Sequence, residues 1–280
     1  MNLHLIKDIR SAYSNLKPGS VRELAEKNVA IGIVTSDDDK AEFIRSFLGP
    51  SDGIVERVSE RAPAEKFALL LVEPGLPRPQ RGYEFHFRDP DVTLESILDA
   101  HQELEVSLAR NYPAFRAKVV DRIVTRTARE NALFSVMTAL PNVLPNFLEL
   151  PWAVGEFASD TAFLTMNQVR MAFLIAAAND HEIGYDEQKV ELGAIVLGAF
   201  GWRSLARELV GKIPLGGGLI PKAAIAYAGS YVVGKGLDKL HRTGSGFDRK
   251  ERRALYNAAV EKGKRVVAQI VDTVKNRNAA

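Results

Sequence analysis

Four polar residues at the ends of two apolar segments are of the types that nucleotide-binding sites use. Thr35, Ser36 and Lys40 follow the first apolar segment, and Glu73 ends the second. An apolar strand followed by a helix is where a phosphate-binding loop of sequence G-x-x-x-x-G-K-[ST] would lie, and Lys40 would supply its lysine. These four residues are therefore the candidate nucleotide-binding residues of the chain.

The glycines of that loop are missing, however. With Lys40 as the motif lysine, Val34 and Asp39 stand at the two glycine positions and Ala41 at the hydroxyl position. Glycine lets backbone N–H groups approach phosphates, and the hydroxyl binds magnesium. Three aspartates, at positions 37–39, would face the polyanionic phosphates. The repulsion in one pair of like charges about 4 Å apart costs roughly 4 kcal/mol at an effective dielectric near 20. Acidic residues in the first turn of a helix cap its free N–H groups, which explains these aspartates better.

The end of the second apolar segment reads Val72-Glu73-Pro74-Gly75-Leu76. It resembles the D-x-x-G segment of small GTPases, usually DTPGL, with glutamate for aspartate and one residue fewer. A base-reading N-K-x-D segment is absent. The resemblance implies a shortened, degenerate GTPase-like region, for which we expect no catalytic residues, no metal and no cofactor. The alternative is a divergent P-loop-like nucleotide-binding protein or GTPase that uses Lys40 and Glu73.

The predicted secondary structure, which would position these residues, changes near residue 95 from strands and helices to helices alone. Near-continuous apolar runs predict strands buried on both faces, and alternation predicts a more exposed one. After residue 95, helical periodicity broken by prolines and glycines predicts a helical bundle. We expect an α+β fold: a small α/β, three-layer-like N-terminal domain with about three strands, followed by a larger all-α helical bundle. The expected strands are 27–35, 67–73 and 83–87, and a helix is expected over 36–49.

Three parts follow from this division. The first is a degenerate GTPase-like α/β domain with an N-terminal docking helix, expected from the helical spacing of the apolar residues near the start. Connecting helices join it to a helical domain that ends in a basic C-terminal helix. The expected boundaries are 1–95, 96–130 and 131–280.

Several motifs of the helical part occur in a recognisable order: Tyr112-Pro113-Ala114-Phe115-Arg116, Asn167-Gln168-Val169-Arg170-Met171, His181-Glu182-Ile183-Gly184, Lys212-Ile213-Pro214-Leu215-Gly216-Gly217 and Val233-Gly234-Lys235-Gly236. This order, over roughly residues 112–240, resembles the bacterial domain of unknown function 697 family, found in YcjF-like inner-membrane proteins and downstream of GTPase domains. The sequence departs from the family at Val169-Arg170, where the family has apolar residues. The resemblance implies a GTPase-associated helical domain and supplies no catalytic residues.

The charge of the chain is concentrated at its C-terminal end. The net charge is only +2, yet from Lys235 onward twelve lysines and arginines stand against five acidic residues. Such a segment either binds anionic lipid headgroups, at about 1 kcal/mol per cation near the surface, or forms a solvated helix face. The candidate residues for a membrane or partner surface are Arg249, Lys250, Arg252, Arg253, Lys262, Lys264 and Arg265.

The remaining features of the sequence limit the functions that we expect of this protein. The chain has no cysteine and five histidines without ligand spacing, which argues against a thiolate or histidine metal site. The charge-free runs Asn131–Leu148 and Ala223–Gly234 are expected to be buried core helices rather than membrane spans, and no signal peptide is recognised. We expect a non-enzymatic scaffold or regulatory protein in the cytoplasm, peripheral on the inner membrane or docked on a protein partner. An anionic membrane surface is one expected partner, nucleic acid is not, and a homo-oligomeric soluble scaffold is a further alternative.

Overall fold

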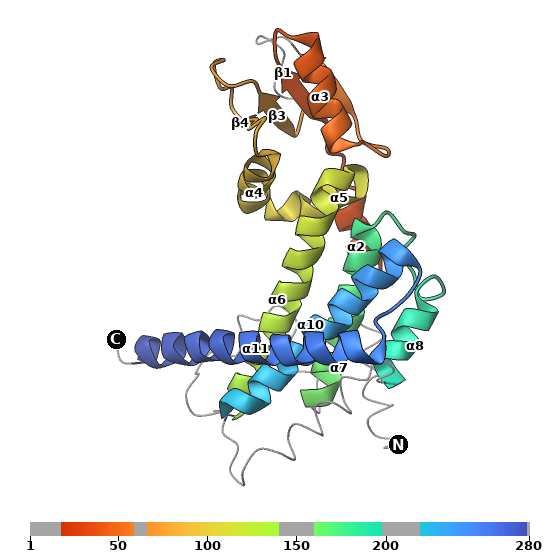
Figure 1. Ribbon diagram of the computed structural model, residues 1–280, viewed down its shortest axis with the longest axis vertical. Coiled ribbons are helices and arrows are strands. Elements are labelled where there is room, and N and C mark those ends of the chain that lie inside the picture. Colours follow the sequence, from red (N-terminus) through yellow and green to blue (C-terminus); the bar gives the residue numbers. More distant parts are fainter. Residues whose placement is uncertain (1–17, 59–65, 140–159, 198–218, 279–280) are drawn as a thin grey trace. The chain divides into compact units, whose positions relative to one another are not determined.

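The computed structural model describes residues 18–58, 66–139, 160–197 and 219–278 (Figure 1). The chain divides into two compact units. The α/β unit comprises Pro18–Asp121 and Ala176–Ile183, and the helical unit comprises Met1–Lys17, Arg122–Ile175 and Gly184–Ala280. The α+β fold class is confirmed, with a small parallel sheet in one unit and a bundle of helices in the other. The α/β unit continues well past the boundary expected at residue 95.

Four parallel strands form the sheet, in the order β2-β1-β3-β4. The two central strands, β1 and β3, are buried at every position, as their uninterrupted apolar sequences predict. The edge strand β2 was not predicted, because its sequence VERV is half polar and carries no apolar run. The bounds are β1 Ile31–Val34, β2 Val55–Val58, β3 Leu69–Val72 and β4 Gly82–Glu84.

The helix that follows β1 has well-defined ends. Asp37 is its N-cap, and its carboxylate accepts hydrogen bonds from two backbone N–H groups of the first turn. Gly49 ends the helix with φ of 57°, a left-handed conformation that favours glycine. The helices of this unit are α2 Pro18–Ala25, α3 Asp38–Leu48, α4 Pro90–Ala100, the short 3₁₀ helix η2 Gln102–Leu104, α5 Glu105–Asn111 and the first part of α6 Pro113–Ala139.

The junction between α5 and α6 belongs to the α/β unit because Tyr112 ties it to the sheet. The Tyr112 side chain is fully buried, and its hydroxyl lies 2.5 Å from the Val29 carbonyl oxygen and 3.0 Å from that of Ile54. Burial raises the pKa of this phenol well above its ordinary value. Arg110 and Arg116 in turn reach the Asp180 carboxylate at 3.4 and 3.7 Å, which holds the segment after α7 in the same unit.

In the helical unit, α10 and α11 pack closely against each other. A Cβ atom on Gly263 of α11 would lie 2.9 Å from the Ala224 carbonyl oxygen, so the absence of a side chain permits this approach. The hairpin between the two helices is fixed by Asp248 and Glu251, each of whose carboxylates accepts a hydrogen bond from the other's backbone N–H. The remaining helices are α7 Asp160–Ala178, α8 Lys189–Leu197, α10 Leu219–Thr243 and α11 Arg249–Asn278.

A group of uncharged polar side chains lies in the core of the helical unit. Asn131 of α6 donates to Ser230 Oγ of α10 at 2.6 Å and accepts from Asn167 Nδ2 of α7 at 2.8 Å. Gln168 of α7 reaches the same serine at 3.3 Å, and all four side chains are at most 6% exposed. Among the described residues, Gln168 Oε1 has no hydrogen-bond partner. We call Asn131, Asn167, Gln168 and Ser230 the buried amide cluster.

Two sequence expectations on the helical part can be compared with the structure. The apolar run Ala223–Gly234 lies inside α10 and is largely buried against α6, α7 and α11. None of the helices, within the residues described, is long and apolar enough to cross a bilayer. The N-terminal docking helix and the segment Lys212–Gly217 lie outside the described residues.

Candidate functional site

The carboxyl ends of β1 and β3 bring together the residues that the sequence singled out. The strands are parallel neighbours with Val34 opposite Val72, so the residues that follow them meet at one edge of the sheet. The chain turns to opposite sides after β1 and after β3, since β2 pairs with the outer side of β1 and β4 with the outer side of β3. In open parallel sheets, ligands bind at this kind of switch point.

At this edge, Glu73 accepts hydrogen bonds from both sides of its carboxylate. Thr35 Oγ1 donates to Glu73 Oε2 at 2.6 Å, and Lys40 Nζ forms a short ion pair with Glu73 Oε1. The backbone N–H of Ser36, whose side chain is exposed, is near enough to the Glu73 carboxylate to help lower its pKa. The structure therefore places all four sequence-predicted residues in one site. We call Thr35, Lys40 and Glu73 the Lys40–Glu73 cluster.

The electrostatics of the cluster follow from these contacts. The hydrogen bond from Lys40, and then that from Thr35, lowers the pKa of Glu73 below its usual value. The hydrogen bond to Glu73 raises the pKa of Lys40. Both groups stay charged at neutral pH, so the lysine charge that a phosphate would need is already neutralised by a carboxylate of the same chain.

Two backbone donors in the first turn of α3 are occupied as well. Asp37 Oδ1 accepts hydrogen bonds from the N–H groups of Asp39 at 2.9 Å and Lys40 at 3.2 Å. These N–H groups at a helix N-terminus would otherwise be available to an anion. Among the described residues there is also no group of three or more acidic, histidine or cysteine side chains that could hold a metal ion. The arrangement is a closed polar contact between two strand ends, and Asp37 has the capping role expected from the sequence.

Arg57 on β2 also belongs to this site and was not predicted from the sequence. Its Nε donates to the Thr35 carbonyl oxygen at 3.1 Å, and its guanidinium forms an ion pair with Asp38. No signal in the sequence marks this residue, because VERV does not alternate apolar and polar residues and reads like a loop. Because β2 was not predicted, nothing connected Arg57 with the end of β1.

The seven candidate cations of the C-terminal helix separate into two groups on α11. Successive residues of a helix are rotated by about 100°, which places four of them within one sector of about 100°. All four are exposed, and the carboxylates of α11 lie outside this sector. Lys264 in addition contacts Glu261 at 2.7 Å. We call this set, Arg249, Lys250, Arg253 and Lys264, the cationic face of α11.

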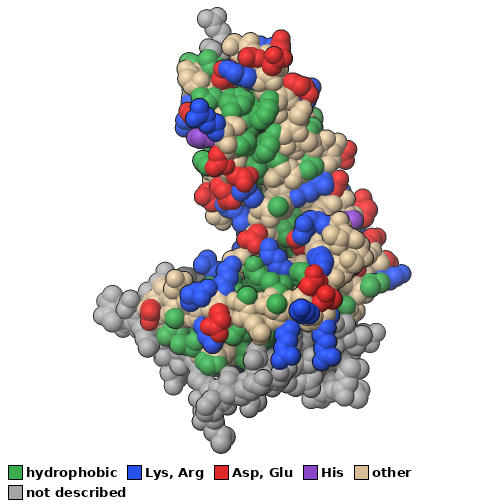
Figure 2. All heavy atoms as spheres, viewed as in Figure 1, with side chains coloured by type: hydrophobic (Ala, Val, Ile, Leu, Met, Phe, Trp, Pro, Cys, Tyr) green, Lys and Arg blue, Asp and Glu red, His purple; other side chains and the backbone are tan. Residues whose placement is uncertain are grey.

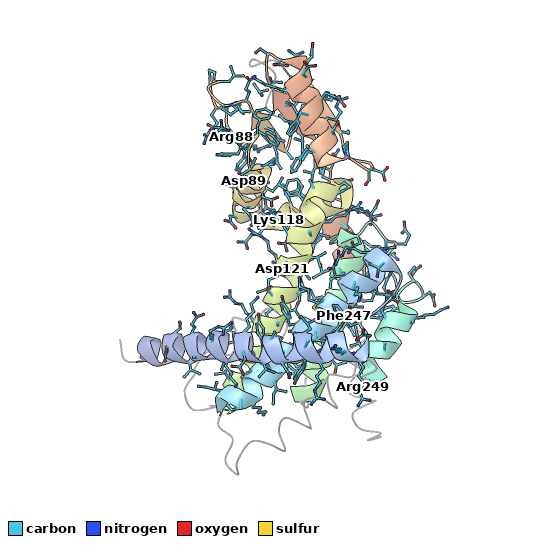
Figure 3. All side chains as sticks on the ribbon, in the orientation of Figure 1. Arg88, Asp89, Lys118, Asp121, Phe247 and Arg249 are labelled. Carbon is cyan, nitrogen blue, oxygen red and sulfur yellow. The ribbon has the colours of Figure 1, made fainter. Side chains whose placement is uncertain are left out.

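The other three candidates have different surroundings. Arg252 is half-buried and donates to the Phe247 carbonyl oxygen at 3.3 Å, where the chain enters α11 (Figure 3). Lys262 is half-buried, with its Nζ 4.9 Å from the centre of the Tyr231 ring. Arg265 is exposed but lies in the sector of the acidic residues. Only the first four can therefore face one flat anionic surface together.

The comparisons with known proteins add no identification. A scan against protein-family models finds no match, and neither the search of curated proteins nor that of solved structures gives one. The resemblance of residues 112–240 to a GTPase-associated helical family thus stays a prediction. Within the described residues, its motifs Tyr112–Arg116 and His181–Ile183 belong to the α/β unit, where Arg116 reaches Asp180 directly before the second motif.

Proposed function

We propose that this chain is a non-enzymatic docking protein that binds an anionic membrane surface through the cationic face of α11. The observation that carries the proposal is the grouping of Arg249, Lys250, Arg253 and Lys264 on one side of a single helix. Arg253 and Lys264 are eleven residues apart, or roughly 16 Å along the axis, so the face is long and linear. A linear row of cations matches a flat layer of headgroups.

The expected binding energy is modest and depends on salt. Each cation near an anionic surface contributes about 1 kcal/mol, so four contribute about 4 kcal/mol, or roughly a thousandfold in affinity. Screening shortens the reach of these charges to about 10 Å at 0.1 M salt. Reversible, peripheral attachment at the cytoplasmic face of the inner membrane is the location that this proposal implies.

Sedimentation with vesicles tests the proposal. We expect the full chain to pellet with vesicles of phosphatidylcholine and phosphatidylglycerol at low salt, and to stay in solution with phosphatidylcholine alone or at high salt. Replacing all four residues of the cationic face by glutamine should abolish pelleting. Arg253→Gln should weaken it by roughly fivefold, whereas Arg265→Gln, with the same change of charge on the same helix, should change it by less than twofold. Equal effects of these two variants would refute the assigned face.

The α/β unit has no catalytic part in this proposal, because the Lys40–Glu73 cluster satisfies its own charges. A second candidate, nucleotide binding, is favoured by the position of Lys40 and Thr35 at the switch point of the sheet. Calorimetry with GTP or ATP and magnesium decides between them. We expect no heat of binding; micromolar binding that disappears in Lys40→Ala would establish the second candidate instead.

A further inference from the structure

Four phenylalanines form an apolar patch on the α/β unit. Phe43 and Phe47 lie one turn apart on α3, and Phe85 and Phe87 follow β4. The ring centres of Phe43 and Phe87 are 5.8 Å apart, those of Phe47 and Phe85 are 5.8 Å apart, and those of Phe85 and Phe87 are 5.0 Å apart. Phe85 is fully buried, but Phe43 is 48% exposed, so the cluster ends at the surface rather than in the core. We call these four residues the phenylalanine patch.

The borders of the patch carry charges of both signs. Asp39 lies one turn before Phe43 on α3, and Arg88 directly follows Phe87. Both side chains are exposed, and within the described part of the chain neither forms an ion pair. Figure 2 shows apolar side chains gathered between α3 and α4 in the upper part of the view, with acidic side chains over α3 and basic ones beside β4. Charged side chains of both signs therefore border the phenylalanine patch, with the exposed Asp89 next to Arg88 on the β4 side.

We propose that the phenylalanine patch binds the same patch of a second copy of this chain, related by a two-fold axis. A two-fold contact is self-complementary: the α3 side of each copy meets the β4 side of the other. Asp39 of one copy would then face Arg88 of the other, twice in each dimer, around a centre of exposed phenylalanine rings. Apolar patches rimmed by polar residues mark interaction sites, and aromatic residues are enriched in interface centres.

The mixed signs of the rim favour a second copy over a lipid surface. An anionic bilayer would attract Arg88 and repel Asp39, whereas a two-fold partner satisfies both. This inference goes beyond the proposed membrane docking, because it uses none of the residues of α11.

Sedimentation equilibrium of the full chain tests the dimer by charge exchange. We expect Asp39→Arg and Arg88→Asp each to be monomeric at concentrations where the original chain dimerises, because each homodimer would contain two like-charged pairs. An equimolar mixture of the two variants should dimerise, since both contacts across the two-fold axis would then join an arginine to an aspartate. The double variant should also dimerise, because it exchanges the two charges and so keeps the opposite signs.

A second pair of variants separates the patch from apolar surface in general. Phe43→Ser should weaken dimerisation by at least about tenfold. Val190→Ser, at a residue of α8 that is 72% exposed, should leave it unchanged. Circular dichroism verifies that each variant is folded. A chain that stays monomeric at all concentrations, a dimer that persists in Phe43→Ser, or a mixture that fails to dimerise would each overturn the proposal.

Discussion

The two polar clusters of this protein, one in each unit, differ in burial and in charge. In the Lys40–Glu73 cluster, the lysine side chain is 43% exposed and the glutamate 14%, so water screens their attraction. In the buried amide cluster the residues are uncharged and at most 6% exposed. A buried group that loses its partner has no water to replace it, whereas an exposed charge does. We therefore expect the buried amide cluster to contribute more to the stability of its unit than the Lys40–Glu73 cluster does. The charges of the Lys40–Glu73 cluster instead affect which ligands can bind at the sheet edge.

The largest effect is expected from breaking the buried amide cluster. Asn131→Ala removes the partner of Asn167 and of Ser230 and leaves a small cavity, so the free energy of unfolding should fall by roughly 2–4 kcal/mol. Urea denaturation followed by circular dichroism measures this. Ser46→Ala, which removes an exposed hydrogen bond to Glu42, is the control and should change stability by less than about 0.5 kcal/mol. A loss below about 1 kcal/mol in Asn131→Ala would contradict the comparison.

A substitution at Tyr112 tests whether the loss of stability depends on the burial of a polar group or on the unit in which the group lies. Tyr112→Phe keeps the ring and removes only the hydroxyl that lies against the Val29 and Ile54 carbonyl oxygens. We expect a loss of roughly 1–2 kcal/mol in the same denaturation experiment. Tyr83→Phe, at a half-buried tyrosine whose hydroxyl has no hydrogen bond within the described chain, should cost much less. Equal losses of stability in Tyr112→Phe and Tyr83→Phe would contradict the dependence of stability on burial.

The N-cap of α3 gives a smaller effect and separates shape from charge. Asp37→Ala removes the acceptor for two backbone N–H groups, and we expect a loss of about 1 kcal/mol. Asp37→Asn keeps an acceptor oxygen and should lose only a few tenths of a kcal/mol. Thermal unfolding of the two variants measures the difference. If both lose the same amount, the negative charge rather than the cap stabilises the helix.

The smallest effect at neutral pH is expected from Glu73→Gln, and it should depend on pH. The pKa of Glu73 is lowered in the folded protein, so its contribution is complete above the ordinary pKa of 4.5 and is lost as the pH falls through the lowered value. The original chain should therefore lose more stability between pH 5 and pH 3 than Glu73→Gln does, and the two should converge at lower pH. Glu42→Gln, at an exposed residue of α3 that forms no ion pair within the described chain, is the control. Parallel pH profiles of the original chain and Glu73→Gln would contradict the assigned ion pair.

Much of the fold was predictable where the local pattern is strong. The apolar runs gave β1 and β3, and Gly49 correctly marked the end of α3. The residues of the sheet-edge site were predicted as a group because Lys40 aligns with the lysine of a phosphate-binding loop and Glu73 ends the next apolar run. The edge strand β2 was missed, since its half-polar sequence does not differ from that of a loop.

The extent of the α/β unit was not predictable from local pattern. The change from strands to helices near residue 95 suggested a boundary there, but a unit is defined by contacts. Tyr112 contacts carbonyl groups 83 and 58 residues away in the chain, and Arg110 reaches Asp180. Such long-range contacts leave no periodicity in the sequence.

By itself, the sequence determined that the phosphate-binding glycines are gone, that α3 begins with acidic caps, and that cations gather near the C-terminal end. These are properties of residue type and of spacing along one element. Only the tertiary structure decided that Lys40 pairs with Glu73 and that Phe43 and Phe87 meet at the surface. Each of these depends on which side chains face each other once the strands and helices have packed.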